Sequence, residues 1–293
     1  MFDMAVLERI CGTTRLVAGQ KTFIMGILNV TKESFSDGGC YINTHDAVEH
    51  GLRMMHDGAD IIDVGGVSTA PHVPMISEQE ELDRIMPVVE RLVQAGISAL
   101  SIDTMRASVA EQALALGASW INDQSAGWFD EKMPAIMAKA DAVVLMHNGG
   151  GASSGVVAGE AVHYHDVVSE VSEFFQMRIK QLGHVGILAN TIIIDPGIGF
   201  GKGLHDTCKL ITGLTPLLEM DAMILMGVSR KSAVGKLSDI ANPADRDWAS
   251  LAAAAKAVQA GAHIVRTHNV KASVEFFRVW DRLSAFSQGL MNS

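Results

Sequence analysis

Eight apolar runs of strand length recur along this chain, and they constrain its fold more than any other feature. Each run is continuous rather than alternating, as expected for strands that are buried on both faces of a parallel sheet. The runs cover 23–28, 60–64, 98–102, 118–121, 142–146, 191–194, 222–226 and 262–265. The segments between the runs then indicate which parallel fold the chain adopts.

Helical patterns fill those segments. In 77–95 the apolar residues follow the spacing of one helix face, and Ser77 precedes Glu80 by three residues, as in a capping box. Further helices are predicted at 45–57, 106–116, 131–139, 165–182, 205–219, 245–260 and 271–285. This alternation predicts an α/β protein with a (β/α)8 TIM barrel in a single domain, and an open doubly wound sheet is the alternative.

The barrel domain is predicted to span 23–293, preceded by a short N-terminal extension, 1–22. The segment "TTRLVAGQKTF" could form a hairpin that closes the barrel floor. The N-terminus lacks a basic region followed by an apolar block, so no secretory signal is expected. No apolar run approaches the length of about 18 residues that would indicate a membrane span.

Charge and cysteine content narrow the classes of partner. The net charge of −10 disfavours a nucleic-acid surface, so any anionic ligand must be held by local cations. The three cysteines, Cys11, Cys40 and Cys208, are too few and too scattered for a disulfide framework or a zinc site. The expectation is a cytoplasmic protein that binds small molecules.

Polar and charged side chains follow the apolar runs, where the loops of a barrel build its active site. They are Asn29, Asp63, Asp103, Asn122, Asp195, Arg230, Lys231, Arg266 and His268. A single aspartate at the end of a strand is usually a helix N-cap or a ligand for loop amides. Complementary groups after most of the strands favour one shared site at the same rim.

Three of these residues suggest a pocket for a flat heterocycle. Asp103, Asn122 and Asp195 would project acceptors and an amide into the barrel mouth. Ionised carboxylates in an apolar barrel are costly unless they meet donors. A ring with several N–H groups would supply those donors.

Three others suggest an anion site. Arg266, His268 and Asn29 follow the eighth and first strands, which are neighbours in a closed barrel. Arginine and histidine donate to anions, and the asparagine oxygen can help to hold a divalent ion. Together they favour a phosphate or diphosphate with Mg²⁺.

Lys231 is open to three interpretations. It could be a Schiff-base nucleophile, a donor to a ring nitrogen or carbonyl, or a surface lysine at the start of a helix. The residues alone do not separate the first two.

Several segments together resemble the dihydropteroate synthase family. The match runs from about Phe23 to Glu275, in the order and spacing of that family. The segments are "MGILNVTKESFSDGG", "IIDVGGVST", "SIDT", "IND", "IDPGIGFGK", "GVSRKS" and "RTH". The segments at the first, sixth and seventh strands are long and specific.

The resemblance implies a transferase of folate biosynthesis. It would join p-aminobenzoate to 7,8-dihydropterin-6-ylmethyl diphosphate, giving dihydropteroate and diphosphate by an SN1-like route. It also implies Mg²⁺ as cofactor and a homodimer formed through late helices. The catalytic residues would be Asp103, Lys231, Arg266 and His268.

The same resemblance assigns the binding residues. Asp103, Asn122, Met146, Asp195, Phe200 and Lys231 would bind the pterin, with Phe200 also bordering the aminobenzoate. Asn29, Arg266 and His268 would hold the diphosphate, with Asn29 as the metal ligand. Phe35, Thr69, Arg230 and Ser232 would border the aminobenzoate. Lys231 as a ring contact disfavours the Schiff-base interpretation.

The chain departs from the family pattern in the loops. In the loop after the second strand, Val67 replaces an acidic residue, Ala70 replaces an arginine and His72 replaces a glycine. Elsewhere Lys32 replaces a proline and Gln124 replaces an apolar residue. One hypothesis is a working synthase with an altered aminobenzoate pocket that also weakens sulfonamides, which mimic aminobenzoate. A second is a pterin-binding paralogue with little synthase activity. A methyltetrahydrofolate:corrinoid methyltransferase would not need the diphosphate segments that this chain retains.

Overall fold

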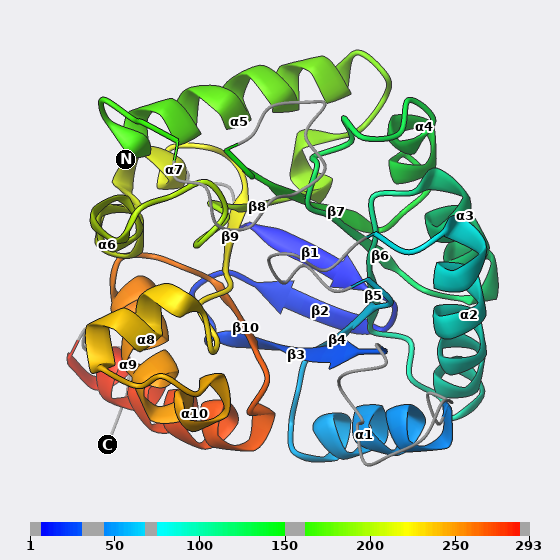
Figure 1. Ribbon diagram of the computed structural model, residues 1–293, viewed down its shortest axis with the longest axis horizontal. Helices are drawn as coiled ribbons and strands as arrows, with labels where there is room; N and C mark the ends of the chain where they lie inside the picture. The colour runs from blue at the N-terminus through cyan, green and yellow to red at the C-terminus, as the bar shows by residue number, and fades with distance from the viewer. Residues whose placement is uncertain (1–6, 31–43, 68–74, 150–161, 288–293) are drawn as a thin grey trace.

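A closed barrel of parallel strands forms the centre of the molecule (Figure 1). The computed structural model describes residues 7–30, 44–67, 75–149 and 162–287. The barrel strands are β3 (Phe23–Asn29), β4 (Ile61–Gly65), β5 (Leu100–Asp103), β6 (Trp120–Asp123), β7 (Ala142–Met146), β8 (Ile192–Asp195), β9 (Met223–Met226) and β10 (Ile264–Thr267). Because β10 pairs with β3, the sheet is closed and the doubly wound alternative is wrong. The predicted barrel is confirmed, and no strand end moves by more than two residues.

Helices form an outer ring around the strands in Figure 1. They are α1 (Thr44–His56), α2 (Glu78–Gln94), α3 (Ala107–Leu116), α4 (Met133–Met137), α5 (Val167–Gly183), α6 (Leu204–Thr212), α7 (Thr215–Leu218), α8 (Ser232–Ser238), α9 (Asp247–Gln259) and α10 (Val270–Ser287). Two short 3-10 turns, Ala189–Thr191 and Pro243–Asp245, precede β8 and α9. The serine half of the predicted capping box is confirmed, since the Ser77 hydroxyl accepts from the Glu80 N–H at 3.1 Å.

Two helical predictions need correction. The single helix expected at 205–219 is divided into α6 and α7, because the chain leaves helical geometry at Gly213 and proline occupies the first turn of α7. Proline lacks an N–H donor and suits the start of a helix rather than its interior. The short helix α8 is not among the predicted ranges, and only one interpretation of Lys231 implied it, since its seven residues are too few to display a clear apolar period.

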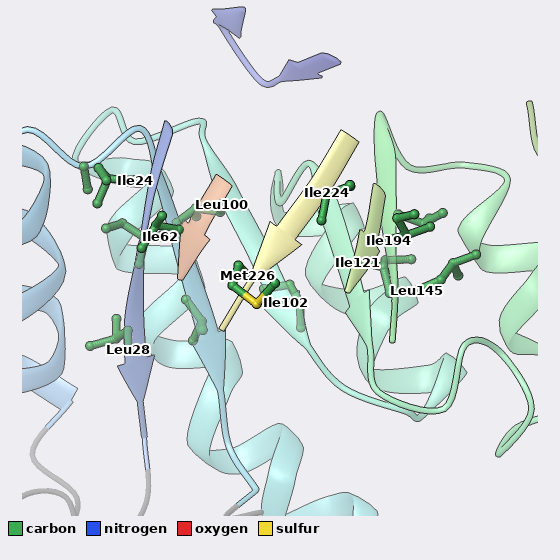
Figure 2. Close-up of a cluster of buried hydrophobic side chains, with 14 of the residues drawn as sticks. Ile24, Leu28, Ile62, Leu100, Ile102, Ile121, Leu145, Ile194, Ile224 and Met226 are labelled. Carbon is green, nitrogen blue, oxygen red and sulfur yellow. The ribbon is translucent and has the colours of Figure 1, made fainter. Parts of the chain in front are cut away.

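Side chains alternate between the two faces of each barrel strand. The outward-facing set packs against the helices and includes Leu28, Ile62 and Ile102 on the neighbouring strands β3, β4 and β5 (Figure 2). The inward-facing set begins with apolar residues near the start of each strand, among them Phe23 and Ile61. The barrel interior is therefore filled at its amino-terminal end.

An N-terminal hairpin completes that packing. Strands β1 (Glu8–Cys11) and β2 (Thr14–Val17) pair antiparallel, earlier in the chain than the 13–23 segment considered for a hairpin. Cys11 and Leu16 join the interior apolar cluster. The buried guanidinium of Arg9 donates to the carbonyl of Ile192 at 2.8 and 3.2 Å, so the hairpin is tied to the start of β8.

The described helices include none with the length and apolar character needed to cross a membrane. Cys11 and Cys208 are both free thiols, and Cys40 lies outside the described ranges.

Candidate active site at the carboxyl end of the barrel

Strand alternation places the polar residues inside the barrel mouth. Asp63 lies two residues beyond Ile61, Asn122 two beyond Trp120 and Asp195 two beyond Ile193, so each shares the inward face of its strand. Asp103 is opposite Asn122 in the strand register, and Met146 is opposite Asp195. The apolar lower layers thus support a polar layer at the carboxyl ends.

One guanidinium joins two carboxylates in this layer. Arg266 donates from Nε to Asp63 Oδ2 at 2.7 Å and from Nη2 to Asp103 Oδ2 at 2.8 Å. The Asn122 amide donates to the same Asp63 oxygen at 3.0 Å. Asp63 is fully buried, so these donors replace the water that its Oδ2 cannot reach. Four strands, β4, β5, β6 and β10, are therefore connected by one polar network.

Asp103 lies at the centre of competing electrostatic effects. Burial raises the pKa of its carboxyl from an ordinary value of 3.8 to about 7, while the Arg266 charge opposes that rise and the Asp63 charge adds to it. Gln124 donates to Asp103 Oδ1 at 2.8 Å and favours the ionised form. Because this pKa lies near neutral pH, adding or removing a hydrogen bond or a charge next to Asp103 changes the fraction of Asp103 that is ionised.

Asp195 and Lys231 form the second part of the site. A methyl group built on Gly227 would lie 3.8 Å from both Asp195 Oδ2 and Lys231 Nζ, which places these two groups around the same small space. Burial raises the pKa of Asp195 and lowers that of Lys231 to about 8. Their opposite charges counteract both shifts, so each group favours the ionised form of the other.

The loop after β8 fixes both groups. Asp195 Oδ1 accepts from the Gly197 N–H at 2.7 Å, and Lys231 Nζ donates to the Ile198 carbonyl at 2.6 Å. Gly197 has φ +69°, and a Cβ there would overlap the His147 carbonyl, so only glycine fits this turn. The Lys231 ammonium also lies 4.8 Å from the Phe200 ring centre. Lys231 does precede the first residue of α8, but its ammonium lies in the site, so it is not a surface lysine.

His268 is a neutral donor in this setting. Burial lowers its pKa to about 3, and the neighbouring Arg230 and Arg266 charges act in the same direction. Ser229 Oγ accepts from the His268 backbone N–H at 3.1 Å and lies 2.9 Å from Nδ1. If the hydroxyl proton is donated to Nδ1, the ring proton resides on Nε2, which then faces away from Ser229 as a donor.

Arg230 is held by α9. Its guanidinium forms two bonds to Asp247, at 2.7 and 3.0 Å, and its backbone has φ +59°. The Ser250 hydroxyl accepts from its N–H and the Arg246 guanidinium donates to its carbonyl, each at 2.9 Å. These contacts stabilise a left-handed conformation that a non-glycine residue rarely adopts. Arg230 therefore lies beside the site with its charge already paired.

The remaining expected residues lie around this centre or outside the described ranges. Asn29 ends β3, Met146 ends β7, and Ser232 begins α8 with an exposed side chain. Phe35 and Thr69, and the departures Lys32, Ala70 and His72, all lie outside the described residues. The metal and aminobenzoate roles assigned to these positions stay predictions.

Sequence reasoning left three contributors without a role. Asp63 was noted at the rim, but its bridge between Asn122 and Arg266 emerges only in the folded barrel. Ser229 and Lys202 were not singled out. A charged residue inside an apolar strand, such as Asp63, is the one signal that could have indicated a buried polar contact.

Comparison with known proteins identifies the family. The family described as "Pterin binding enzyme" matches residues 25–268. The dihydropteroate synthase of Synechocystis sp. is 38% identical over 273 residues, covering 93% of each chain. The chain belongs to the dihydropteroate synthase family. Two solved structures of dihydropteroate synthase from Xanthomonas albilineans agree with this assignment.

The first of these synthase structures, with 4-aminobenzoic acid, gives a TM-score of 0.87 at 39% identity and covers 96% of this chain and 99% of that one. The second, in complex with 7,8-dihydropteroate, gives a TM-score of 0.82 at 38% identity and covers 95% of this chain and 99% of that one. Two departures from the synthase pattern lie in described segments. Val67 is partly buried just after β4, and Gln124 contacts Asp103 directly.

The raised pKa of Asp103 predicts a pH-dependent cost to stability. Between about pH 4 and about pH 7, folded Asp103 keeps a proton that the unfolded chain has released, so stability falls as pH rises through this window. Asp103→Asn does not titrate, and its stability relative to the native chain should increase from about pH 4.5 to about pH 7.5. Urea unfolding at several pH values measures this difference.

Asp83→Asn, which removes a carboxylate from the exposed face of α2, is the matched control. A difference between Asp103→Asn and the native chain that stays constant with pH would contradict the assignment.

Proposed function

We propose that this chain is a dihydropteroate synthase. It condenses 7,8-dihydropterin-6-ylmethyl diphosphate with p-aminobenzoate and releases dihydropteroate and diphosphate. The observation that carries the proposal is the arrangement of Asp103, Asn122 and Asp195 around Lys231 and Arg266 in one barrel mouth. This is the donor and acceptor set that an aminopyrimidinone ring requires.

The pterin binds with its polar edge toward the carboxylates. Asp195 and Asn122 accept and donate along the aminopyrimidinone edge, while Lys231 donates to the ring. Gly227 supports this pose, because its missing side chain leaves space between Asp195 and Lys231. Met146 and Phe200 are buried and apolar, and they cover the ring faces.

The reaction begins with cleavage of the C–O bond between the pterin methylene and the diphosphate. The methylene cation that forms is delocalised into the ring, where the charges of Asp103 and Asp195 stabilise it. The aniline nitrogen of aminobenzoate then forms the new C–N bond and loses a proton. No covalent intermediate with Lys231 is required, which favours its role as a ring donor.

Arg266 and His268 act on the leaving group. Burial lowers the pKa of Arg266, but the Asp63 and Asp103 charges outweigh burial and leave the pKa raised, so Arg266 stays cationic throughout the working range of pH. Neutral His268 can donate from Nε2 while Ser229 holds Nδ1. These two donors stabilise negative charge as the diphosphate departs.

Mg²⁺ is proposed as the cofactor, bound together with the diphosphate. Among the described residues no cluster of three acidic, histidine or cysteine side chains could hold a metal. Asn29 ends β3 at the barrel mouth, and a single neutral oxygen fits an ion whose other ligands are phosphate and water. When bound, Mg²⁺ would neutralise charge on the leaving diphosphate.

The aminobenzoate site is proposed beside the loops after β3, β4 and β9. Phe35, Thr69 and Ser232 would border it, with Phe200 between it and the pterin. Arg230 would act from a distance, since Asp247 already pairs with its guanidinium. Binding of the benzoate carboxylate therefore depends strongly on the loops that hold Lys32 and Ala70.

The synthase activity is tested directly by product formation. Purified protein receives the dihydropterin diphosphate and Mg²⁺, with and without p-aminobenzoate, and dihydropteroate is measured by chromatography. Product should require aminobenzoate and should decrease by roughly two orders of magnitude or more in Lys231→Ala and in Arg266→Ala, because each removes a charge at the reacting substrate. Lys236→Ala, which removes a lysine from the last turn of α8, is the matched control.

Absence of product from the native chain, with pterin still binding in calorimetry, would contradict the synthase and support the paralogue. Transfer of a methyl group to a corrinoid would instead support the methyltransferase.

The replaced arginine of the β4 loop gives a second prediction. Removal of a cation near the benzoate should weaken aminobenzoate and sulfonamides together. Ala70→Arg should therefore lower the KM for aminobenzoate and raise the inhibition by a sulfonamide, each by about three- to tenfold, as for a partly exposed ion pair. Ala70→Gln, which adds length without charge, should change neither. Equal kinetics for all three proteins would exclude this explanation.

A homodimer is the proposed assembly. On α10, Val279, Leu283 and Phe286 expose 58, 65 and 70% of their surface, and their spacing of four and three residues places them on one face. Sedimentation velocity should give a dimer for the native chain and a monomer for Leu283→Glu, because the charge would be buried at the interface. A native chain that is monomeric at micromolar concentration would contradict it.

A further inference from the structure

Gln124 lies in the proposed pterin site, and only the nitrogen of its side-chain amide has a hydrogen-bond partner among the described residues. It follows β6 directly and is 8% exposed. Its Nε2 donates to Asp103 Oδ1 at 2.8 Å, but its Oε1 is buried without a hydrogen-bond partner among the described residues. A buried acceptor without a donor is costly, so this oxygen indicates a missing ligand group.

The loop around Gln124 gives it little freedom to move. Asp123 accepts from the N–H groups of Ser125 and Gly127, at 2.7 and 2.9 Å. Arg178 of α5 donates to the carbonyls of Ala126 and Gly127, at 2.6 and 3.0 Å. The backbone on the carboxyl side of Gln124 is therefore held in place, and the Gln124 side chain bonds Asp103 from this support.

The amide nitrogen of Gln124 matters because it is one of two donors that bond the Asp103 carboxylate. Arg266 takes one carboxylate oxygen and Gln124 takes the other. The apolar residue that the family usually has at this position has no N–H to offer. In this chain, then, both oxygens of Asp103 have fixed directions before a substrate arrives.

We propose that Gln124 is a positioning and specificity-determining residue of the pterin pocket. Its amide N–H group orients Asp103, and its free Oε1 accepts a hydrogen bond from an N–H of the bound pterin. The inference rests on the proposed function, and it deepens that function by adding one acceptor that recognises the pterin rather than the aminobenzoate.

A Gln124→Met variant removes both ends of the amide while keeping an unbranched side chain of similar length. The affinity for a dihydropterin, measured by calorimetry, should decrease about tenfold or more, as for hydrogen bonds to a charged group and to a ligand. The KM for aminobenzoate should change less than about twofold, because the lost contacts face the pterin. Little change in Tm is expected, since loss of the unpartnered oxygen offsets loss of the donor.

The pH profile separates positioning from general damage. The charged groups around Asp103 are Arg266 on β10, Asp63 on β4, Glu81 on α2 and Lys231 before α8. Gln124→Met leaves all of them in place and removes only a bond that favours ionised Asp103. The acid limb of kcat/KM should then move to higher pH, and Gln124→Glu, which adds a like charge beside Asp103, should move it further.

Gln94→Met is the matched control, because Gln94 also donates its amide to a carboxylate, that of Glu90, but on the exposed surface of α2. It should resemble the native chain in every measurement. Native pterin affinity and an unmoved acid limb in both Gln124 variants would overturn the inference. A decrease in pterin affinity matched by an equal increase in the KM for aminobenzoate would also overturn it.

The calorimetric readout does not require turnover. If the native chain binds dihydropterin but forms no product, the proposed function fails while the pterin affinity of Gln124→Met still decides the inference.

Discussion

The site depends on one guanidinium that is shared between two buried carboxylates. Asp63 and Asp103 lie on neighbouring strands, and their charges would repel each other inside the barrel without Arg266 between them. Loss of one member of such a network leaves the others buried and unpaired, which typically costs about 3–5 kcal/mol. The network is therefore both a structural requirement of the barrel mouth and the means by which Asp103 is directed at a ligand.

Burial shifts Asp103, Asp195, Lys231 and His268 toward their neutral forms, because it raises the pKa of the two carboxyls and lowers the pKa of the lysine and of the histidine. Opposite charges counteract this shift at Asp103, Asp195 and Lys231, whereas the charges of Arg230 and Arg266 add to it at His268. A substrate that brings N–H donors to the carboxylates and an anion to Arg266 replaces the lost water with fixed dipoles and charges. The same environment suits a reaction in which a cation forms beside an anionic leaving group.

The loops that carry these groups are fixed by buried lysine and arginine side chains. Lys202 donates to the carbonyls of His147 and Phe200, both at 2.9 Å, and joins the loops after β7 and β8. Arg178 and Arg246 bond carbonyls after β6 and around α8 in the same way. Backbone carbonyls held by charged donors keep short loops in one conformation, so the catalytic side chains are placed by rigid supports.

Sequence alone determined the eight strands, most of the helices and the rim that holds the site, because continuous apolar runs and helical spacing are local properties. It also indicated the family through contiguous segments such as "IDPGIGFGK" and "GVSRKS". Only the tertiary structure decided that Asp63 bridges Asn122 and Arg266, that Asp247 pairs with Arg230, and that Gln124 holds Asp103. These contacts join residues on different elements, and their partners depend on barrel closure and side-chain direction, which no local pattern in the chain encodes.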